Sequence, residues 1–198
     1  IEWTAPFLLT MIALIGTTIT PWGQFFIQSY VVDKGLGIKH YKAEKLEVFI
    51  GAFITNIVSF FIIISTAYTL YKTGVHIADA KDVALALKPL AGNFATILFG
   101  FGLFVASMLG AFILPTATAY AICEAFGWEY GFNKKWEEAR IFYSIILVSI
   151  AIPAVLVLLP GLPLIKVMLL SQDINGILLP IILIFVLKII NDKEIMGE

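Results

Sequence analysis

Polar and helix-breaking residues interrupt a long apolar segment near the start of this chain. Residues 6–32 are long enough to cross a bilayer as a helix. The centre of the segment holds residues that disfavour a regular helix or carry a hydroxyl group: Gly16, Thr17, Thr18, Thr20, Pro21 and Gly23. Pro21 has no backbone N–H and its ring clashes with the carbonyl group four residues earlier, so the helix is predicted to break between Thr17 and Pro21.

Two interpretations of this break remain open. Irregular backbone at membrane depth is tolerated where it lines a protein or aqueous cavity, and secondary transporters bind substrates and ions at such discontinuous helices. The alternative is a proline kink in a packed helix, with threonine hydroxyls bonded to carbonyl groups of the preceding turn. The first interpretation predicts a cavity beside residues 17–21, and the second predicts tight packing around them.

A second polar group lies about ten residues inside another apolar segment, 162–190. This group consists of Gln172, Asp173 and Asn175. A charged group at that depth costs roughly 3 kcal/mol or more, so it normally faces a cavity or a partner group. The pattern favours a functional role for Gln172 and Asp173. The alternatives are a polar packing cluster, or an Asp173 that burial keeps neutral.

The chain carries no pattern of residues typical of an enzyme. It has no nucleophile elbow, no Gly-rich phosphate loop and no HExxH sequence. A net charge of −1 without a basic run gives no indication of nucleic-acid binding. The single cysteine, Cys123, excludes an internal disulfide and a multi-thiolate metal site, and is predicted to pack in an apolar environment.

Composition assigns the elements that carry these residues to an all-α integral membrane protein. Of the 198 residues, 60% are hydrophobic and 14% charged, and the mean hydropathy is +0.97. Soluble domains have a much lower apolar fraction. Five apolar segments exceed roughly 17 residues, the lower limit for a membrane-spanning helix. Within a single transmembrane domain, 1–198, these spans are predicted at about 6–32, 46–71, 89–126, 141–159 and 162–190.

The distribution of basic residues predicts the orientation of the spans. Nine of the 13 lysines and arginines fall on one side and four on the other, and the richer side is expected to be cytoplasmic. The chain then begins outside and ends inside. The richer set is Lys34, Lys39, Lys42, Lys45, Lys134, Lys135, Arg140, Lys188 and Lys193. Because the chain opens with Ile1 and has no signal peptide, it is expected to be part of a longer polypeptide.

Three stretches together resemble the NRAMP family of divalent metal transporters. They are Gly16-Thr-Thr-Ile-Thr-Pro21, Leu170-Ser-Gln followed by Leu179-Pro180, and Asp192-Lys-Glu-Ile-Met-Gly197. The resemblance covers essentially all of the chain. It implies a LeuT-like fold with a discontinuous first helix, in which this chain forms the second of two inverted repeats, the sixth to tenth helices of the family.

The resemblance also implies a set of metal ligands. In the family, the unwound helix supplies a backbone carbonyl and a methionine sulfur, positions that match Thr17 and Thr20 here. The family's glutamine ligand matches Gln172. The remaining ligands, an aspartate and an asparagine, belong to a helix that precedes this chain, so the chain is expected to hold at most half of a metal site.

Departures from the family pattern change the expected metal. Thr20 places a hard oxygen where the family has a soft thioether, which favours transition metals. The family's two histidines linked to proton movement fall on Trp22 and Ile27, which do not titrate. These features resemble the NRAMP-related magnesium transporter branch. Mg²⁺ keeps several waters, so a roomier all-oxygen site is expected to bind Mg²⁺ or Mn²⁺ through Thr17, Thr20, Gln24, Gln172 and Asp173.

The expected function is therefore secondary transport of Mg²⁺ or Mn²⁺ without tight proton coupling, in a multi-pass protein of the plasma membrane. The expected partners are the metal ion, the lipid bilayer and the missing N-terminal half of the transporter, with no nucleic acid. No cofactor is expected besides the transported metal. Two alternatives stay open: a LeuT-fold carrier of an organic solute such as an amino acid, and a non-transporting membrane scaffold subunit.

Overall fold

All regular structure in the described part of the chain is helical. The computed structural model describes residues 3–71, 82–84, 88, 92 and 94–197. Five stretches of these residues are long and apolar enough to cross a membrane: Ala5–Asp33, Ile38–Thr69, Phe94–Phe126, Arg140–Val157 and Leu164–Ile190. The prediction of an all-α chain with five candidate spans is therefore confirmed. The predicted start of the third span, residue 89, lies outside the described residues.

The chain divides into two compact units, and each is described by itself. The first unit combines Ile1–Ser29 with Leu114–Glu198, and the second is Tyr30–Ile113. The first unit contains α1 (Ala5–Thr18), most of α2 (Pro21–Asp33), the C-terminal part of α6 (Phe94–Phe126), α7 (Arg140–Val157), α8 (Leu164–Ile190) and the short α9 (Lys193–Met196). It therefore carries both polar groups identified in the sequence.

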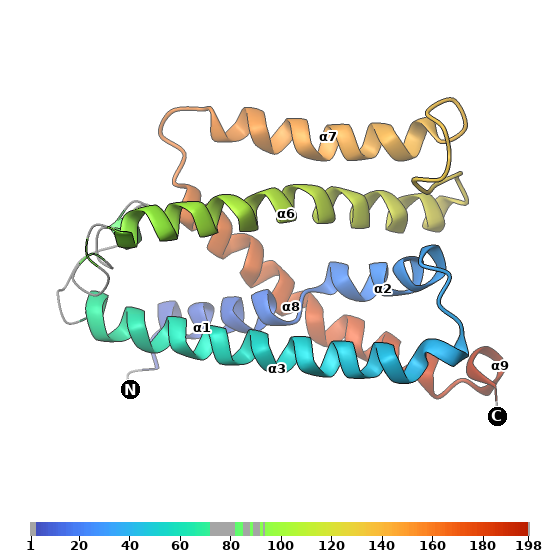
Figure 1. Ribbon diagram of the computed structural model, residues 1–198, viewed down its shortest axis with the longest axis horizontal. Helices are drawn as coiled ribbons and strands as arrows, with labels where there is room; N and C mark the ends of the chain where they lie inside the picture. The colour runs from blue at the N-terminus through green and yellow to red at the C-terminus, as the bar shows by residue number, and fades with distance from the viewer. Residues whose placement is uncertain (1–2, 72–81, 85–87, 89–91, 93, 198) are drawn as a thin grey trace. The chain divides into compact units, whose positions relative to one another are not determined.

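Two helices, α1 and α2, share the first predicted span. α1 ends at Thr18, because Ile19 leaves the helical region with φ −120° and ψ 86°. α2 begins two residues later, at Pro21. Proline is favoured in the first turn of a helix, where its missing N–H would have no partner anyway. α8 runs across α1 at a steep angle (Figure 1) and packs against it.

The core of the first unit lies between α6 and α7. Tyr120 and Cys123 of α6 are buried together with Phe142 of α7. The rings of Tyr120 and Phe142 meet edge to face, with centroids 5.0 Å apart, a favourable aromatic geometry. Cys123 is 0% exposed, which confirms the prediction that it packs in an apolar environment.

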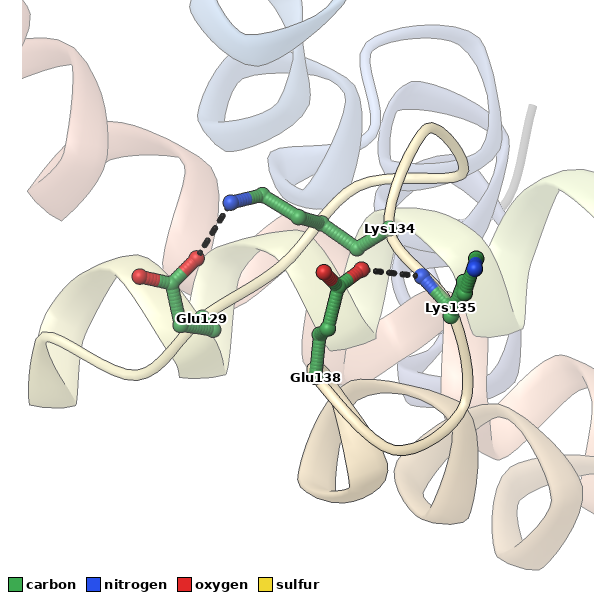
Figure 2. A network of polar contacts seen from close by, with 4 residues as sticks. All are labelled: Glu129, Lys134, Lys135 and Glu138. Carbon is green, nitrogen blue, oxygen red and sulfur yellow. Dashed lines mark hydrogen bonds and ion pairs between the residues drawn. The ribbon is translucent and has the colours of Figure 1, made fainter.

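The connection from α6 to α7 is held by its own polar contacts (Figure 2). Lys134 Nζ lies 3.0 Å from Glu129 Oε2, and the backbone N–H of Lys135 donates to Glu138 Oε2 at 2.7 Å. The hydrogen bond and charge of Glu129 raise the pKa of Lys134 above its ordinary value. Tyr143 of α7 donates its hydroxyl to the carbonyl of Lys134 at 2.7 Å. These contacts fix where α7 begins relative to the end of α6.

The second unit is built around one long apolar helix. Its elements are η1 (Ile38–His40), α3 (Tyr41–Thr66), the π-helical η2 (Ala67–Tyr71) and the N-terminal part of α6. α3 has no buried residue, although most of its sequence is apolar. Its one asparagine, Asn56, donates from Nδ2 to the carbonyl of Ala52 in the same helix at 2.8 Å.

Candidate functional site

Two glycines bring the backbones of α1 and α8 into direct contact. A Cβ atom placed on Gly16 of α1 would clash with the carbonyl oxygen of Gln172 and the amide nitrogen of Gly176, and would lie 2.9 Å from Gly176 Cα. A Cβ on Gly176 would lie 2.5 Å from the carbonyl oxygen of Ile12. Small residues at such crossings let membrane helices approach closely. The last turn of α1 is thereby fixed against the polar stretch of α8.

Gln172 and Asp173 both lie on the side of α8 that meets α1. They precede Gly176 by four and three residues, and residues at these spacings share one helix face. Asn175 donates from Nδ2 to Oε1 of Gln172 at 3.2 Å. Asp173 has one carboxylate oxygen, Oδ1, that is buried and has no hydrogen-bond partner among the described residues. A buried carboxylate oxygen without a partner is costly.

Both helices leave a backbone carbonyl without its helical donor at this crossing. The residue four positions after Thr17 is Pro21, and the residue four positions after Gly176 is Pro180. Neither proline has an N–H to donate. The carbonyl groups of Thr17 and Gly176 are therefore left as acceptors within one unit, close to the glycine contact.

The remaining residues of the predicted site surround the break between α1 and α2. Thr17 is exposed, whereas Thr20 and Gln24 are half-buried. The hydroxyl of Thr20 lies over the first turn of α2, 3.6 Å from where a Cβ of Gly23 would stand. The neighbouring Thr18 is differently engaged, since its hydroxyl donates to the carbonyl of Leu14 at 2.8 Å.

The acidic and imidazole groups needed for a complete metal centre do not gather in the described residues. No group of three or more His, Cys, Asp or Glu side chains there could hold a metal ion. Asp173 is the acidic member of the predicted set. At the crossing, α8 carries the carboxylate of Asp173 and the side-chain amide of Gln172.

A second polar contact was not anticipated from the sequence. Ser29 of α2 is 2% exposed and donates from Oγ to Oε1 of Glu124, on α6, at 2.8 Å. Glu124 also lines a cavity of about 580 Å³ together with Gln28, Gly127, Trp128, Glu129 and Tyr130. Ser29 and Glu124 lie within three residues of the ends of the predicted spans 6–32 and 89–126. The criterion applied to Asp173, a polar group about ten residues inside a span, therefore does not single them out.

Comparison with known proteins gives one family. The model of the natural resistance-associated macrophage protein-like family, Nramp, matches residues 3–198. The chain is 24% identical over 195 residues to the divalent metal cation transporter MntH of Clostridium acetobutylicum, covering 96% of the chain and 43% of that relative. It is 26% identical over 198 residues to MntH of Caldanaerobacter subterraneus subsp. tengcongensis, covering 96% and 44%. No solved structure matches significantly. The chain thus spans less than half the length of these relatives.

Proposed function

This chain belongs to the Nramp family, and we propose that it forms part of a secondary transporter that moves divalent metal cations across a membrane. The family is one of multi-pass integral membrane proteins without enzymatic activity. Relatives of the chain carry the name divalent metal cation transporter. Because those relatives are more than twice as long as the matched region, the activity is proposed for the longer transporter and not for this chain alone.

The buried, unpartnered Oδ1 atom of Asp173 is the observation that carries this proposal. A carboxylate inside a membrane helix needs a counter-charge, a donor or a proton, and the described part of the chain offers Oδ1 no donor. A scaffold helix would be expected to pair such a group with a neighbour. A transported cation supplies the missing charge when it binds.

The ligands that we propose are all oxygen atoms. They are the backbone carbonyl of Thr17, the hydroxyl of Thr20, the side-chain amide oxygen of Gln172 and the carboxylate of Asp173. Oxygen ligands suit Mg²⁺, which keeps several of its waters, and also suit Mn²⁺. Gln172 Oε1 accepts a hydrogen bond from Asn175, and the second lone pair of this oxygen remains for an ion.

Two residues of α2 support transport without tight proton coupling, as in the NRAMP-related magnesium transporter branch. After the break, α2 carries Trp22 and Ile27 at the two positions where the family has proton-linked histidines. Neither side chain titrates. We propose that α1 and α2 are the halves of one discontinuous helix of a LeuT-like second repeat, and that rocking of the bundle containing them gives alternating access.

Calorimetric titration of the full-length transporter in detergent tests this function. Mg²⁺ and Mn²⁺ are titrated separately into the wild type and into Thr20→Met. We expect saturable Mg²⁺ binding that weakens in Thr20→Met, because a thioether is a poor ligand for Mg²⁺. If neither Mg²⁺ nor Mn²⁺ binds, the metal proposal is overturned. Strong proton co-transport with Mg²⁺ in proteoliposomes would overturn the uncoupled mechanism alone.

A further inference from the structure

An open groove runs between α6 and α7, away from the α1–α8 crossing. It has a volume of about 440 Å³ and is bordered by Ile122 of α6. The α7 side is formed by Arg140, Ile141, Ser144, Ile145, Val148 and Ser149. From residue 141 these positions follow the i, i+3, i+4, i+7 and i+8 spacing of a single helix face. The groove is thus mainly apolar along α7, with the positively charged side chain of Arg140 at one end.

Two polar side chains of the groove, Arg140 and Ser144, have no partner in the part of the chain that the structure describes. Arg140 begins α7, and it makes no ion pair or hydrogen bond in the described part of the chain. Two acidic residues precede it, but Glu138 already accepts the backbone N–H of Lys135, and Glu137 is exposed. The hydroxyl of Ser144 has no partner among the described residues either, whereas Thr118 of α6 bonds back to its own helix.

Helix polarity adds to the positive charge of Arg140. The residue before α7, Ala139, cannot cap the helix with its side chain. The first backbone N–H groups of a helix carry a partial positive charge and favour an anion. An anion held by the Arg140 guanidinium would therefore also lie near the unfilled start of this 18-residue helix.

Aromatic side chains place this end of the groove at a membrane interface. Trp136 stacks on Tyr143 with ring centroids 5.7 Å apart, and Phe126 stacks on Trp128 at 4.8 Å. Both tryptophans are exposed. Tryptophan and tyrosine gather at the headgroup level of a bilayer, so Arg140 lies at that level and the apolar part of the groove extends from it into the hydrocarbon region.

We propose that this groove binds an anionic phospholipid, with the lipid phosphate at Arg140 and an acyl chain along Ile141, Ile145 and Val148. Basic pockets between membrane helices on the cytoplasmic side are suited to anionic headgroups. The charge pattern of the sequence assigns Arg140 to that side. The proposal is independent of the transported ion, because none of the groove residues belongs to the proposed metal site.

Thermal unfolding of the full-length transporter in detergent tests the lipid site. Phosphatidylglycerol and phosphatidylcholine with identical acyl chains are added separately, and inorganic phosphate is added in a third series. The variants are Arg140→Gln, which removes the charge, Val148→Trp, which fills the groove, and the matched control Lys188→Gln, which removes a basic residue in the last turn of α8.

We expect phosphatidylglycerol to raise the unfolding temperature of the wild type more than phosphatidylcholine does, and phosphate to have no effect. Arg140→Gln should lose at least half of the phosphatidylglycerol-specific rise, and Lys188→Gln should keep it. Val148→Trp should reduce the rise while retaining Arg140, so it decides the matter if Arg140→Gln does not fold. The proposal would be overturned if both groove variants kept the full phosphatidylglycerol-specific rise, or if Lys188→Gln lost as much of it as Arg140→Gln does. It would also be overturned if phosphate raised the unfolding temperature as much as phosphatidylglycerol does.

Discussion

Asp173 is the residue whose substitution is expected to reduce transport most. Replacing Asp173 by Asn keeps the size of the side chain and removes the charge that we propose attracts the cation. We expect divalent metal uptake to fall at least tenfold, which corresponds to about 1.4 kcal/mol. Uptake by the full-length transporter in proteoliposomes measures the effect.

Glu137→Gln is the matched control for Asp173→Asn, because it removes an exposed carboxylate in the α6–α7 connection. Its uptake should equal that of the wild type. If Asp173→Asn folds and transports normally, Asp173 is a packing residue and the scaffold interpretation gains support.

The hydrogen bond between Ser29 and Glu124 is expected to contribute to stability. Ser29→Ala would leave Glu124 Oε1 without its donor, at a cost of about 1–3 kcal/mol. Thr118→Ala is the control, since the Thr118 hydroxyl is exposed and only bonds back to the carbonyl of Leu114. We expect a lower unfolding temperature for Ser29→Ala than for Thr118→Ala. Equal unfolding temperatures would show that Glu124 finds another donor.

Sequence reasoning identified the polar residues of the α1–α8 crossing without locating them relative to one another. Thr17, Gln172 and Asp173 stood out because each interrupts an apolar segment. Ser29 and Glu124 are 95 positions apart, and no local pattern links a serine and a glutamate at that separation. Which pairs meet depends on how the helices pack, which composition and periodicity do not specify.

At the scale of elements, the glycine contact between α1 and α8 is expected to tolerate no side chain. An alanine at Gly16 or Gly176 would place its Cβ against the backbone of the other helix, so neither helix can yield by moving a flexible side chain. Overpacking of this kind costs about 1–3 kcal/mol. We expect both variants to lower the unfolding temperature and the uptake rate of the full-length transporter.

Gly51→Ala is the matched control for the glycine contact. A Cβ on Gly51, in α3, would meet no described atom within 4 Å, and alanine is the better helix former by up to about 1 kcal/mol. Its stability should be unchanged or higher. If Gly16→Ala behaved like Gly51→Ala, α1 and α8 would not depend on this close approach.

The apolar segments predicted which parts of the chain are helical better than they predicted where each helix ends or which helices pack together. The second span was predicted from residue 46, whereas α3 begins at Tyr41. The intervening residues include Glu44 and Lys45, which are good helix formers but too polar to be counted in an apolar window. The partner of each helix was not predicted, because helices that are apolar on all sides give no periodic signal for the face that is buried.

At the scale of the whole molecule, most of the apolar surface of the described chain is left uncovered. Large hydrophobic side chains are exposed on α1, α2, α3, α6, α7 and α8, and α3 has no buried residue. Lipid and the rest of a longer transporter are both suitable neighbours for such surfaces. This agrees with a chain that matches about 43% of the length of a relative.

The orientation of this chain in the membrane can be measured with cysteine labelling, because its single native cysteine is buried and should not react with the label. Cys123 is 0% exposed and should react with a membrane-impermeant maleimide only after denaturation. Two variants of the full-length transporter, each with one cysteine added beside Cys123 and with any cysteine outside this chain replaced, then report the two sides. Lys135→Cys lies in the α6–α7 connection, and Leu158→Cys, at an 81% exposed position, lies just after α7.

The excess of basic residues around Lys135 predicts that this connection is cytoplasmic. In inside-out vesicles we expect the maleimide to label Lys135→Cys and to spare Leu158→Cys, with the opposite result in right-side-out vesicles. α7 alone separates the two positions, and its 18 residues are within the range of a membrane-spanning helix, roughly 17–25 residues. Labelling of both positions from one side would therefore mean that α7 does not cross. A reversed pattern would place Arg140 on the outer face and would move the proposed lipid groove to the outer leaflet.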